Sequence, residues 1–167
     1  EGLTVVDLMR RAEIDIKTVS IKNTGEVTTS HGITLLTDCV FEETDFSDAD
    51  MLVLPGGMPG TKYLGEYTPL TELLKFFYSK GGKVAAICAA PSVFADLGFL
   101  EGRKATSYPS FMGKLKGALL TEEPVAVDGN VTTSRGLGTA IDFALSLIGQ
   151  LKGMEKAQEI AESIVYF

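Results

Sequence analysis

The chain has 167 residues, 45% of them hydrophobic, and 22 acidic against 15 basic side chains give it a net charge of −7. This length predicts one domain with a substantial core, whereas the acidic balance disfavours a nucleic-acid or anionic membrane surface. No apolar run approaches the roughly 20 residues that span a bilayer. Two cysteines, Cys39 and Cys88, without a signal-peptide pattern predict a cytoplasmic protein that lacks a disulfide framework.

Hydrophobic periodicity predicts helices and strands in alternation along the chain. The predicted elements are a helix over 3–12, a strand over 14–21, a hairpin over 26–41, a strand entering a glycine turn over 50–60, a helix over 68–80, a strand over 83–88, a helix over 90–100, a hairpin over 125–134, and helices over 138–151 and 154–167. Strands rich in Val, Ile and Leu that alternate with amphipathic helices predict an α/β three-layer sandwich. Its sheet is expected to be mainly parallel and flavodoxin-like, with helices on both faces.

Two strand ends are candidate positions for a functional site, because sites in such sheets lie beyond the carboxyl ends of the strands. They read "VLPGG" at 53–57 and "AAIC" at 85–88, and both finish in small residues that allow close approach of a ligand. Most free cysteines are buried packing residues. Cys88, however, lies between a strand end and a helix start, where backbone N–H groups and the helix dipole favour a thiolate. The N–H groups of Gly57 and Ala89 are candidates to stabilise an oxyanion beside it.

A nucleophilic cysteine is usually paired with a base, most often histidine. The chain has one histidine, His31, which falls in the predicted hairpin turn, where a solvated turn residue is the simpler interpretation. A Cys-His-acid triad therefore has little support. A carboxylate remains as the partner of Cys88, and composition does not select it among 22 acids. Cys39, in an apolar run, is interpreted as a packing residue or a half-exposed thiol.

Several motifs together resemble the ThiJ/PfpI family, also called the DJ-one superfamily. They are "DLMRRA", "VLPGG", "AAICAAPSVFADLGFLEGRKAT", "YPSF" and "TTSRGLGTAIDFAL", which follow the family order across nearly the whole chain. The likeness is greatest to the YajL-like and human DJ-one branch, whose fold is of the class I glutamine amidotransferase type. The resemblance implies one such domain over 1–167 and a homodimer. It also implies a first strand and an acidic turn before Glu1, so we expect an upstream segment in the native protein.

Carried over by position, the resemblance makes Cys88 an oxidisable nucleophile and Glu1 the carboxyl group that hydrogen-bonds its sulfur. A protonated Glu1 would favour the thiolate, so we expect a depressed Cys88 pKa. Gly57 and Ala89 match the residues whose N–H groups face the thiol. The remaining matches form two sets. The pocket residues are Gly56, Tyr108, Pro109, Gly136 and Leu137, and the residues at the dimer border are Arg11 and His31.

Two departures from the family pattern concern this pocket. Tyr108 stands where several members carry histidine, and with an unperturbed pKa of about 10 it is a poor base at neutral pH. Leu137 stands where human DJ-one has proline, which we interpret as a minor change.

The function implied by the resemblance is a glyoxalase III-type or deglycase-like enzyme that acts on methylglyoxal and related dicarbonyls or glycated adducts, without metal or diffusible cofactor. The alternative is a redox-sensing stress-response protein or chaperone whose Cys88 oxidises to sulfinic acid. A peptidase is disfavoured because Ala89 stands where protease-like members place histidine. An amidotransferase is disfavoured because no histidine follows His31. An inert Cys88 in a domain that serves through dimer contacts is the remaining alternative.

Overall fold

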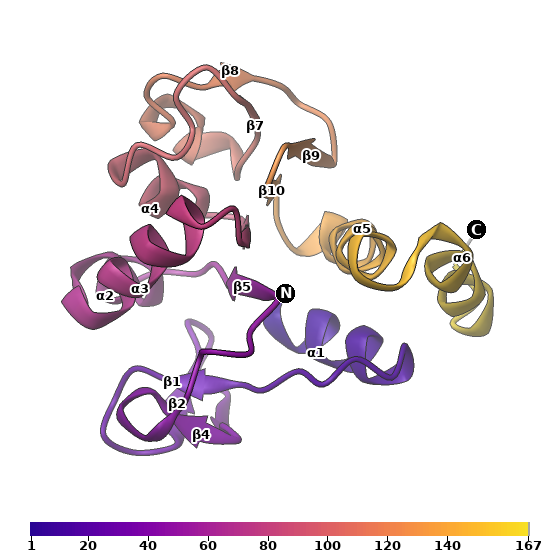
Figure 1. Ribbon diagram of the computed structural model, residues 1–167, viewed down its shortest axis with the longest axis horizontal. Coiled ribbons are helices and arrows are strands. Elements are labelled where there is room, and N and C mark those ends of the chain that lie inside the picture. Colours follow the sequence, from indigo (N-terminus) through magenta and orange to yellow (C-terminus); the bar gives the residue numbers. More distant parts are fainter. Residues whose placement is uncertain (167) are drawn as a thin grey trace.

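The computed structural model describes residues 1–166 (Figure 1). The α-helices are α1 (Gly2–Arg11), α2 (Gly60–Glu66), α3 (Thr68–Ser79), α4 (Pro91–Asp96), α5 (Ala140–Lys152) and α6 (Met154–Ser163). The strands are β1 (Val19–Ser20), β2 (Glu26–Thr28), β3 (Thr34–Leu36), β4 (Cys39–Val40), β5 (Met51–Leu54), β6 (Lys83–Ile87), β7 (Lys104–Ala105), β8 (Leu119–Leu120), β9 (Val125–Asp128) and β10 (Val131–Ser134). Three short 3₁₀ turns are η1 (Phe41–Glu43), η2 (Pro109–Lys114) and η3 (Leu137–Thr139).

The central sheet has the strand order β5-β6-β10-β9. β5, β6 and β10 run parallel, and β9 joins β10 as an antiparallel hairpin. In this register Leu54 pairs with Ala86, and Ile87 pairs with Ser134. The carboxyl ends of three neighbouring strands therefore meet at one edge of the sheet. This edge is where the predicted site residues were expected to gather.

Helices cover both faces of this sheet, which confirms the predicted sandwich (Figure 1). Successive side chains of β6 point to opposite faces, so Ala85 and Ile87 pack into the layer of α1, α5 and α6, whereas Val84 and Ala86 pack into the layer of α3 and α4. Every residue of β6 from 84 to 87 is buried. A fully buried Leu or Ile side chain contributes about 1.5–3 kcal/mol to folding. β6 is thus anchored from both sides.

Two predicted elements differ from the structure. The strand predicted over 14–21 shortens to β1, because Asp38 accepts hydrogen bonds from both the N–H and the hydroxyl of Thr18 at the point where a longer strand would pair. β1 pairs in parallel with β4, in a sheet separate from the central one. The hairpin predicted over 26–41 is correct only as far as Leu36, since Cys39 and Val40 belong to β4.

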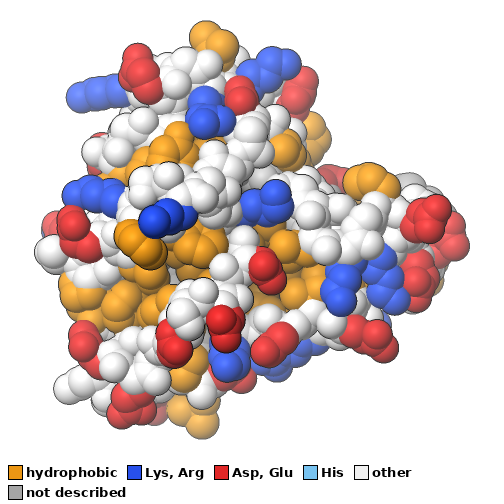
Figure 2. Space-filling model, viewed as in Figure 1, with side chains coloured by type: hydrophobic (Ala, Val, Ile, Leu, Met, Phe, Trp, Pro, Cys, Tyr) orange, Lys and Arg blue, Asp and Glu red, His pale blue; other side chains and the backbone are white. Residues whose placement is uncertain are grey.

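The other predicted elements are present with shifted ends. The helix predicted over 90–100 is limited to the short α4, and the last helix ends at Ser163, with Phe167 outside the described residues. Figure 2 shows acidic and basic side chains interspersed over one face of the molecule, with apolar patches between them. Within residues 1–166, no helix combines the length and apolar character needed to cross a bilayer.

Candidate active site

Cys88 occupies a sharp turn between β6 and α4. Its φ is +67°, a left-handed conformation that costs a non-glycine residue about 1–2 kcal/mol. Hydrogen bonds hold the turn on both sides, because the Cys88 N–H donates to the carbonyl of Ser134 at 2.9 Å and the Cys88 carbonyl accepts from the N–H of Tyr108 at 2.9 Å. The surrounding backbone thus holds Cys88 in the strained conformation. Such strain is typical of functional positions.

Two backbone donors and one carboxyl group surround the Cys88 sulfur. The N–H groups of Gly57, at the turn after β5, and of Ala89, next in the elbow, donate toward the sulfur, whereas the thiol itself donates to the side chain of Glu1. The first turn of α1 places Glu1, since the Glu1 carbonyl accepts the N–H of Val5 at 3.2 Å and Val5 is buried in the α1–α5 core. The structure thus brings together Cys88, Glu1, Gly57 and Ala89 from three separate segments of the chain.

The ionisation of Cys88 departs from the prediction. Burial raises the pKa of the Cys88 thiol, and the charge and hydrogen bond of Glu1 raise it further, whereas the N–H groups of Gly57 and Ala89 lower it. The net direction is upward, so the predicted depressed pKa is wrong for this structure, because the prediction neglected the desolvation of the sulfur. A proton on Glu1 removes the charge repulsion. The pKa of the Cys88 thiol therefore depends on the charge of the neighbouring carboxyl group.

Two glycines allow the close packing of this site. A Cβ on Gly56 would lie 2.5 Å from the Cβ of Cys88, 2.7 Å from the carbonyl oxygen of Ile87 and 2.9 Å from Oε2 of Glu1. A Cβ on Gly136 would lie 3.7 Å from Oε1 of Glu1 and 3.5 Å from the Tyr108 ring. The Glu1 carboxyl group therefore lies in a slot between the two glycines. Gly56 leaves no room for any side chain.

The other predicted pocket residues lie toward solvent. The side chain of Tyr108 is 49% exposed and that of Leu137 is 73% exposed. Pro109 is also exposed and begins η2. Tyr108 and Gly136 adjoin each other, so these residues border the open side of the site.

The two residues predicted at a dimer border are placed differently from each other. His31 lies at the tip of the β2–β3 hairpin, where its Nδ1 is 3.2 Å from Oγ of Ser30. Ser30 Oγ in turn lies 3.2 Å from the position of a Cβ on Gly57, so the hairpin tip reaches the turn that faces Cys88. Arg11 is exposed on α1 and donates to Asp7 at 2.8 Å. The sequence gives no signal for the Ser30 contact, because it depends on how the hairpin folds over the sheet.

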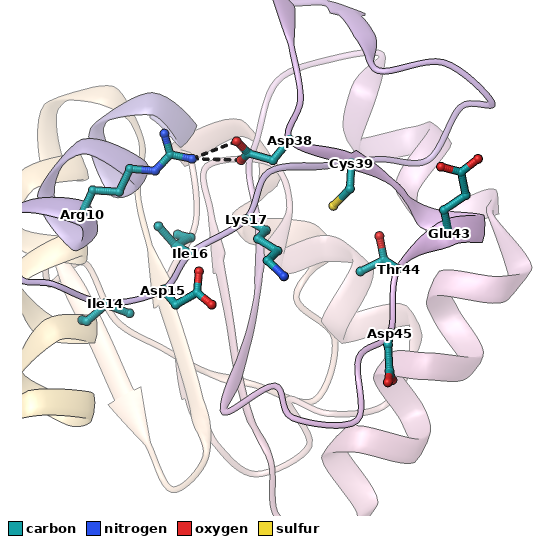
Figure 3. Close-up of a pocket in the computed structure, with 10 residues that line it drawn as sticks. All are labelled: Arg10, Ile14, Asp15, Ile16, Lys17, Asp38, Cys39, Glu43, Thr44 and Asp45. Atoms are coloured by element: carbon teal, nitrogen blue, oxygen red, sulfur yellow. Dashed lines mark hydrogen bonds and ion pairs between the residues drawn. The ribbon is translucent and has the colours of Figure 1, made fainter.

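A separate cavity of about 510 Å³ lies at the far end of α1 (Figure 3). Arg10, Lys17, Asp38 and Cys39 are among its lining residues. Cys39 is half-buried, and its thiol donates to the carbonyl of Thr18 at 3.7 Å.

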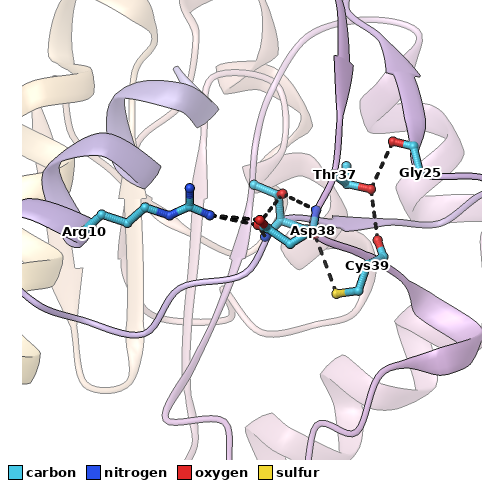
Figure 4. A network of polar contacts seen from close by, with 6 residues as sticks. Arg10, Gly25, Thr37, Asp38 and Cys39 are labelled. Atoms are coloured by element: carbon cyan, nitrogen blue, oxygen red, sulfur yellow. Dashed lines mark hydrogen bonds and ion pairs between the residues drawn. The ribbon is translucent and has the colours of Figure 1, made fainter.

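A polar network beside this cavity centres on Asp38 (Figure 4). Asp38 accepts hydrogen bonds from Thr18 and from Nη2 of Arg10, which lies 3.1 Å from Oδ1 and 2.9 Å from Oδ2 of the carboxylate. Hydrogen bonds from the Thr18 backbone and hydroxyl, with Arg10 adding to them, lower the pKa of Asp38 to about 2. The network ties α1 to β1 and β4. Across residues 1–166, no group of three or more His, Cys, Asp or Glu side chains is arranged to hold a metal ion.

Comparison with known proteins shows similarity over almost the whole chain. The model of the DJ-1/PfpI family matches residues 1–150. Protein DJ-1 homolog B of Arabidopsis thaliana is 40% identical over 167 residues, which are 99% of this chain and 38% of that protein. Protein dj-1beta of Drosophila melanogaster is 37% identical over 167 residues, covering 99% of this chain and 89% of that protein. The chain thus spans less than half of the plant relative and most of the fly relative.

Solved structures share the architecture described above. Oxidized DJ-1 of Toxoplasma gondii superposes with a TM-score of 0.95 at 35% identity, covering 99% of this chain and 91% of that one. The crystal structure of Drosophila melanogaster DJ-1beta gives a TM-score of 0.95 at 36% identity, with 99% and 90% coverage.

Proposed function

Because the chain belongs to the DJ-1/PfpI family, we propose that it is a cysteine-dependent glyoxalase III-type enzyme acting on methylglyoxal and related dicarbonyls, with deglycase-like activity on their adducts. The observation that carries the proposal is the Cys88 elbow. A thiol at φ +67° lies between two N–H donors and a carboxyl group, which is an arrangement for a nucleophile with a proton carrier.

The reaction begins with attack of the Cys88 thiolate on the aldehyde carbon, which forms a C–S bond and places negative charge on the former carbonyl oxygen. In this proposal the N–H groups of Gly57 and Ala89, which adjoin the sulfur, stabilise this charge, and Glu1 delivers its proton to the oxygen, giving a hemithioacetal. The proton that Glu1 delivers comes from the Cys88 thiol, which transfers it to the Glu1 carboxylate as the thiolate forms.

The second half of the reaction is an internal redox step. Glu1, now a carboxylate, removes the hydrogen on the sulfur-bearing carbon as a proton, and the resulting enediol is reprotonated on the neighbouring carbon. The aldehyde carbon is thereby oxidised to a thioester while the ketone is reduced to an alcohol. Water then cleaves the C–S bond, which releases lactate and restores the Cys88 thiol. Methylglyoxal and one water give lactic acid, so no external oxidant enters the balance.

The test compares conversion of methylglyoxal to lactate by the unaltered protein and by Cys88→Ser, Glu1→Gln and Cys39→Ser. We expect turnover to vanish in C88S, to fall by at least about 100-fold in E1Q, and to persist in C39S, since Cys39 lies at the separate cavity. The same proteins are tested on a methylglyoxal-treated peptide for release of the adduct. Lactate formation that continues in C88S would refute the proposal.

A redox-sensing stress-response role, or a chaperone role controlled in the same way, is the second candidate. It is favoured by the accessible side of Cys88 and by the similarity to the oxidized form of Toxoplasma gondii DJ-1. Mass spectrometry after mild peroxide treatment distinguishes it. Addition of two oxygen atoms at Cys88 in a protein that does not consume methylglyoxal would place this role first.

We also propose a homodimer with Arg11 and His31 at its border. Light scattering at micromolar concentration tests this proposal, and a monomer would contradict it.

A further inference from the structure

The loop that follows β10, residues 135–139, lies between the Glu1 carboxyl group and a pair of hydroxyl groups at its two ends. We propose that Ser134 and Thr139, called here the hydroxyl clamp, are positioning residues that hold this loop against Glu1 and so keep its carboxyl group beside the Cys88 thiol. The proposal deepens the proposed function, on which it rests for its catalytic meaning.

Ser134 is the fixed end of the hydroxyl clamp. It is fully buried at the end of β10, where its carbonyl accepts the N–H of Cys88 at 2.9 Å. Its hydroxyl donates to the carbonyl of Pro124 at 2.7 Å, which leaves the oxygen free to accept another bond. The Thr139 hydroxyl lies 2.7 Å from the Ser134 hydroxyl, and either group can donate in this contact. The clamp is therefore anchored to the same residue that holds the backbone of the nucleophile.

Thr139 closes the loop on Gly136. Its hydroxyl oxygen accepts the N–H of Gly136 at 3.1 Å, and its own N–H donates to the carbonyl of Gly136 at 3.0 Å. These two bonds fix the position of Gly136 relative to Ser134. The next residue, Leu137, is largely exposed, so its side chain contributes little packing that could hold the loop in place. Without the two bonds of Thr139, the loop would therefore open toward solvent.

The position of Gly136 decides the width of the slot that holds Glu1. Oε2 of Glu1 faces Gly56 and Oε1 faces Gly136, at 2.9 and 3.7 Å from where a Cβ would be on each. The turn at Gly56 forms one wall and the clamped loop forms the other. Release of the loop removes one wall, so the carboxyl group gains freedom and spends less time at the sulfur.

Other groups around the sulfur do not replace this contact. Tyr108 and His31 are the further titratable side chains on the elements packed around the site, and Glu1 is the one that hydrogen-bonds the thiol. Arg135, on the loop itself, donates to the carbonyl of Glu122 at 2.9 Å. Loosening the loop therefore acts on Cys88 through Glu1.

The experiment compares Thr139→Val, which keeps the branched shape without the hydroxyl, with Thr139→Ser, which keeps the hydroxyl. Thr71→Val is the matched control, because the Thr71 hydroxyl, like that of Thr139, lies within reach of a backbone carbonyl three residues before it, that of Thr68 in α3. The measurements are methylglyoxal turnover, melting temperature, and the pH at which iodoacetamide half-alkylates Cys88, followed by mass spectrometry of its peptide.

We expect T139V to lower kcat about tenfold and to move the alkylation midpoint to lower pH, since the negative carboxyl group then acts less on the thiol. T139S is expected to retain the kcat and the alkylation midpoint of the unaltered protein. T71V is expected to lower the melting temperature without moving the alkylation midpoint. If T139V does not fold, Thr139→Ala serves in the same comparison.

An alkylation midpoint in T139V equal to that of the unaltered protein would overturn the positioning role and leave Thr139 as a helix-capping residue. If the unaltered protein does not convert methylglyoxal, the proposed function fails. The alkylation midpoint, which requires no turnover, still decides whether the clamp positions Glu1.

Discussion

Substitution of Gly56 by alanine is expected to damage both the stability and the reactivity of the protein. The new Cβ would lie 2.5 Å from the Cβ of Cys88 and 2.7 Å from the carbonyl oxygen of Ile87. Carbon atoms in contact lie about 3.5 Å apart or more, so the elbow and the β5 turn must separate by about 1 Å. Neither neighbour yields easily, because Ile87 is fully buried in β6 and the backbone of Cys88 is hydrogen-bonded on both sides.

Overpacking of this kind costs about 1–3 kcal/mol of unfolding free energy, and we expect the upper end, since backbone atoms must move. A displacement of about 1 Å in a catalytic group costs on the order of 100-fold in rate. Urea unfolding measures the change in unfolding free energy. Methylglyoxal turnover and the rate of Cys88 alkylation measure the loss of reactivity. Gly60→Ala is the control, because a Cβ there meets nothing within 4 Å at the start of α2. A G56A protein as stable and as reactive as G60A would refute the steric reasoning.

Four further predictions concern substitutions of single side chains. The alkylation midpoint of Cys88 is expected above that of a free cysteine, and Glu1→Gln is expected to lower it; an unchanged midpoint in E1Q would show that Glu1 does not act on the thiol. Asp38→Asn is expected to cost about 1 kcal/mol at neutral pH, discounted for the exposure of the group. Because the folded pKa of Asp38 is about 2 and the ordinary value is 3.8, this contribution is present above pH 3.8 and lost as the pH falls through about 2, so the two proteins should unfold alike in strong acid. Thr106→Val is expected to leave the unfolding free energy unchanged or to raise it by up to about 1 kcal/mol, because the buried Thr106 hydroxyl has no hydrogen-bond partner in the described part of the chain. Thr133→Val, which removes the acceptor of the Thr106 N–H, is expected to lower the unfolding free energy by about 1–3 kcal/mol, and equal behaviour of the two variants in urea would contradict both predictions.

The sequence predicts the layers of this fold because its strong signals are local. The apolar run at 84–87 and the small residues after it suffice to predict a buried strand over 83–88, and the structure has that strand over Lys83–Ile87. The strand predicted over 14–21 fails for a non-local reason, since Asp38 binds the N–H of Thr18 from 20 residues away. Alternating apolar residues in that segment carry no information about such a competitor.

The features of the candidate site also divide into those that the local sequence predicts and those that depend on contacts between distant segments. Glycines after a strand indicate close approach, and the structure places Gly56 against Cys88. The contacts of Ser30 and Thr139 were not predictable, because each depends on the path of a loop and not on a pattern of residues. The direction of the Cys88 pKa was mispredicted because the depth of burial of a sulfur atom is a property of packing and not of neighbouring residues in the chain.

The buried strand β6 has a consequence for how the site responds to thermal opening of the fold. Its residues are enclosed by both helix layers and by strands on either side, and the Cys88 N–H is bonded to Ser134 in the next strand. In amide hydrogen exchange, the backbone of the nucleophile should belong to the slowest-exchanging unit of the protein, whereas the hairpin tip at Ser30 and the first turn of α1 lie at the surface and should exchange much sooner. Local opening would then withdraw the carboxyl group and the hairpin from the sulfur while the elbow stays intact, so the thiol becomes more exposed without loss of the backbone conformation that holds it.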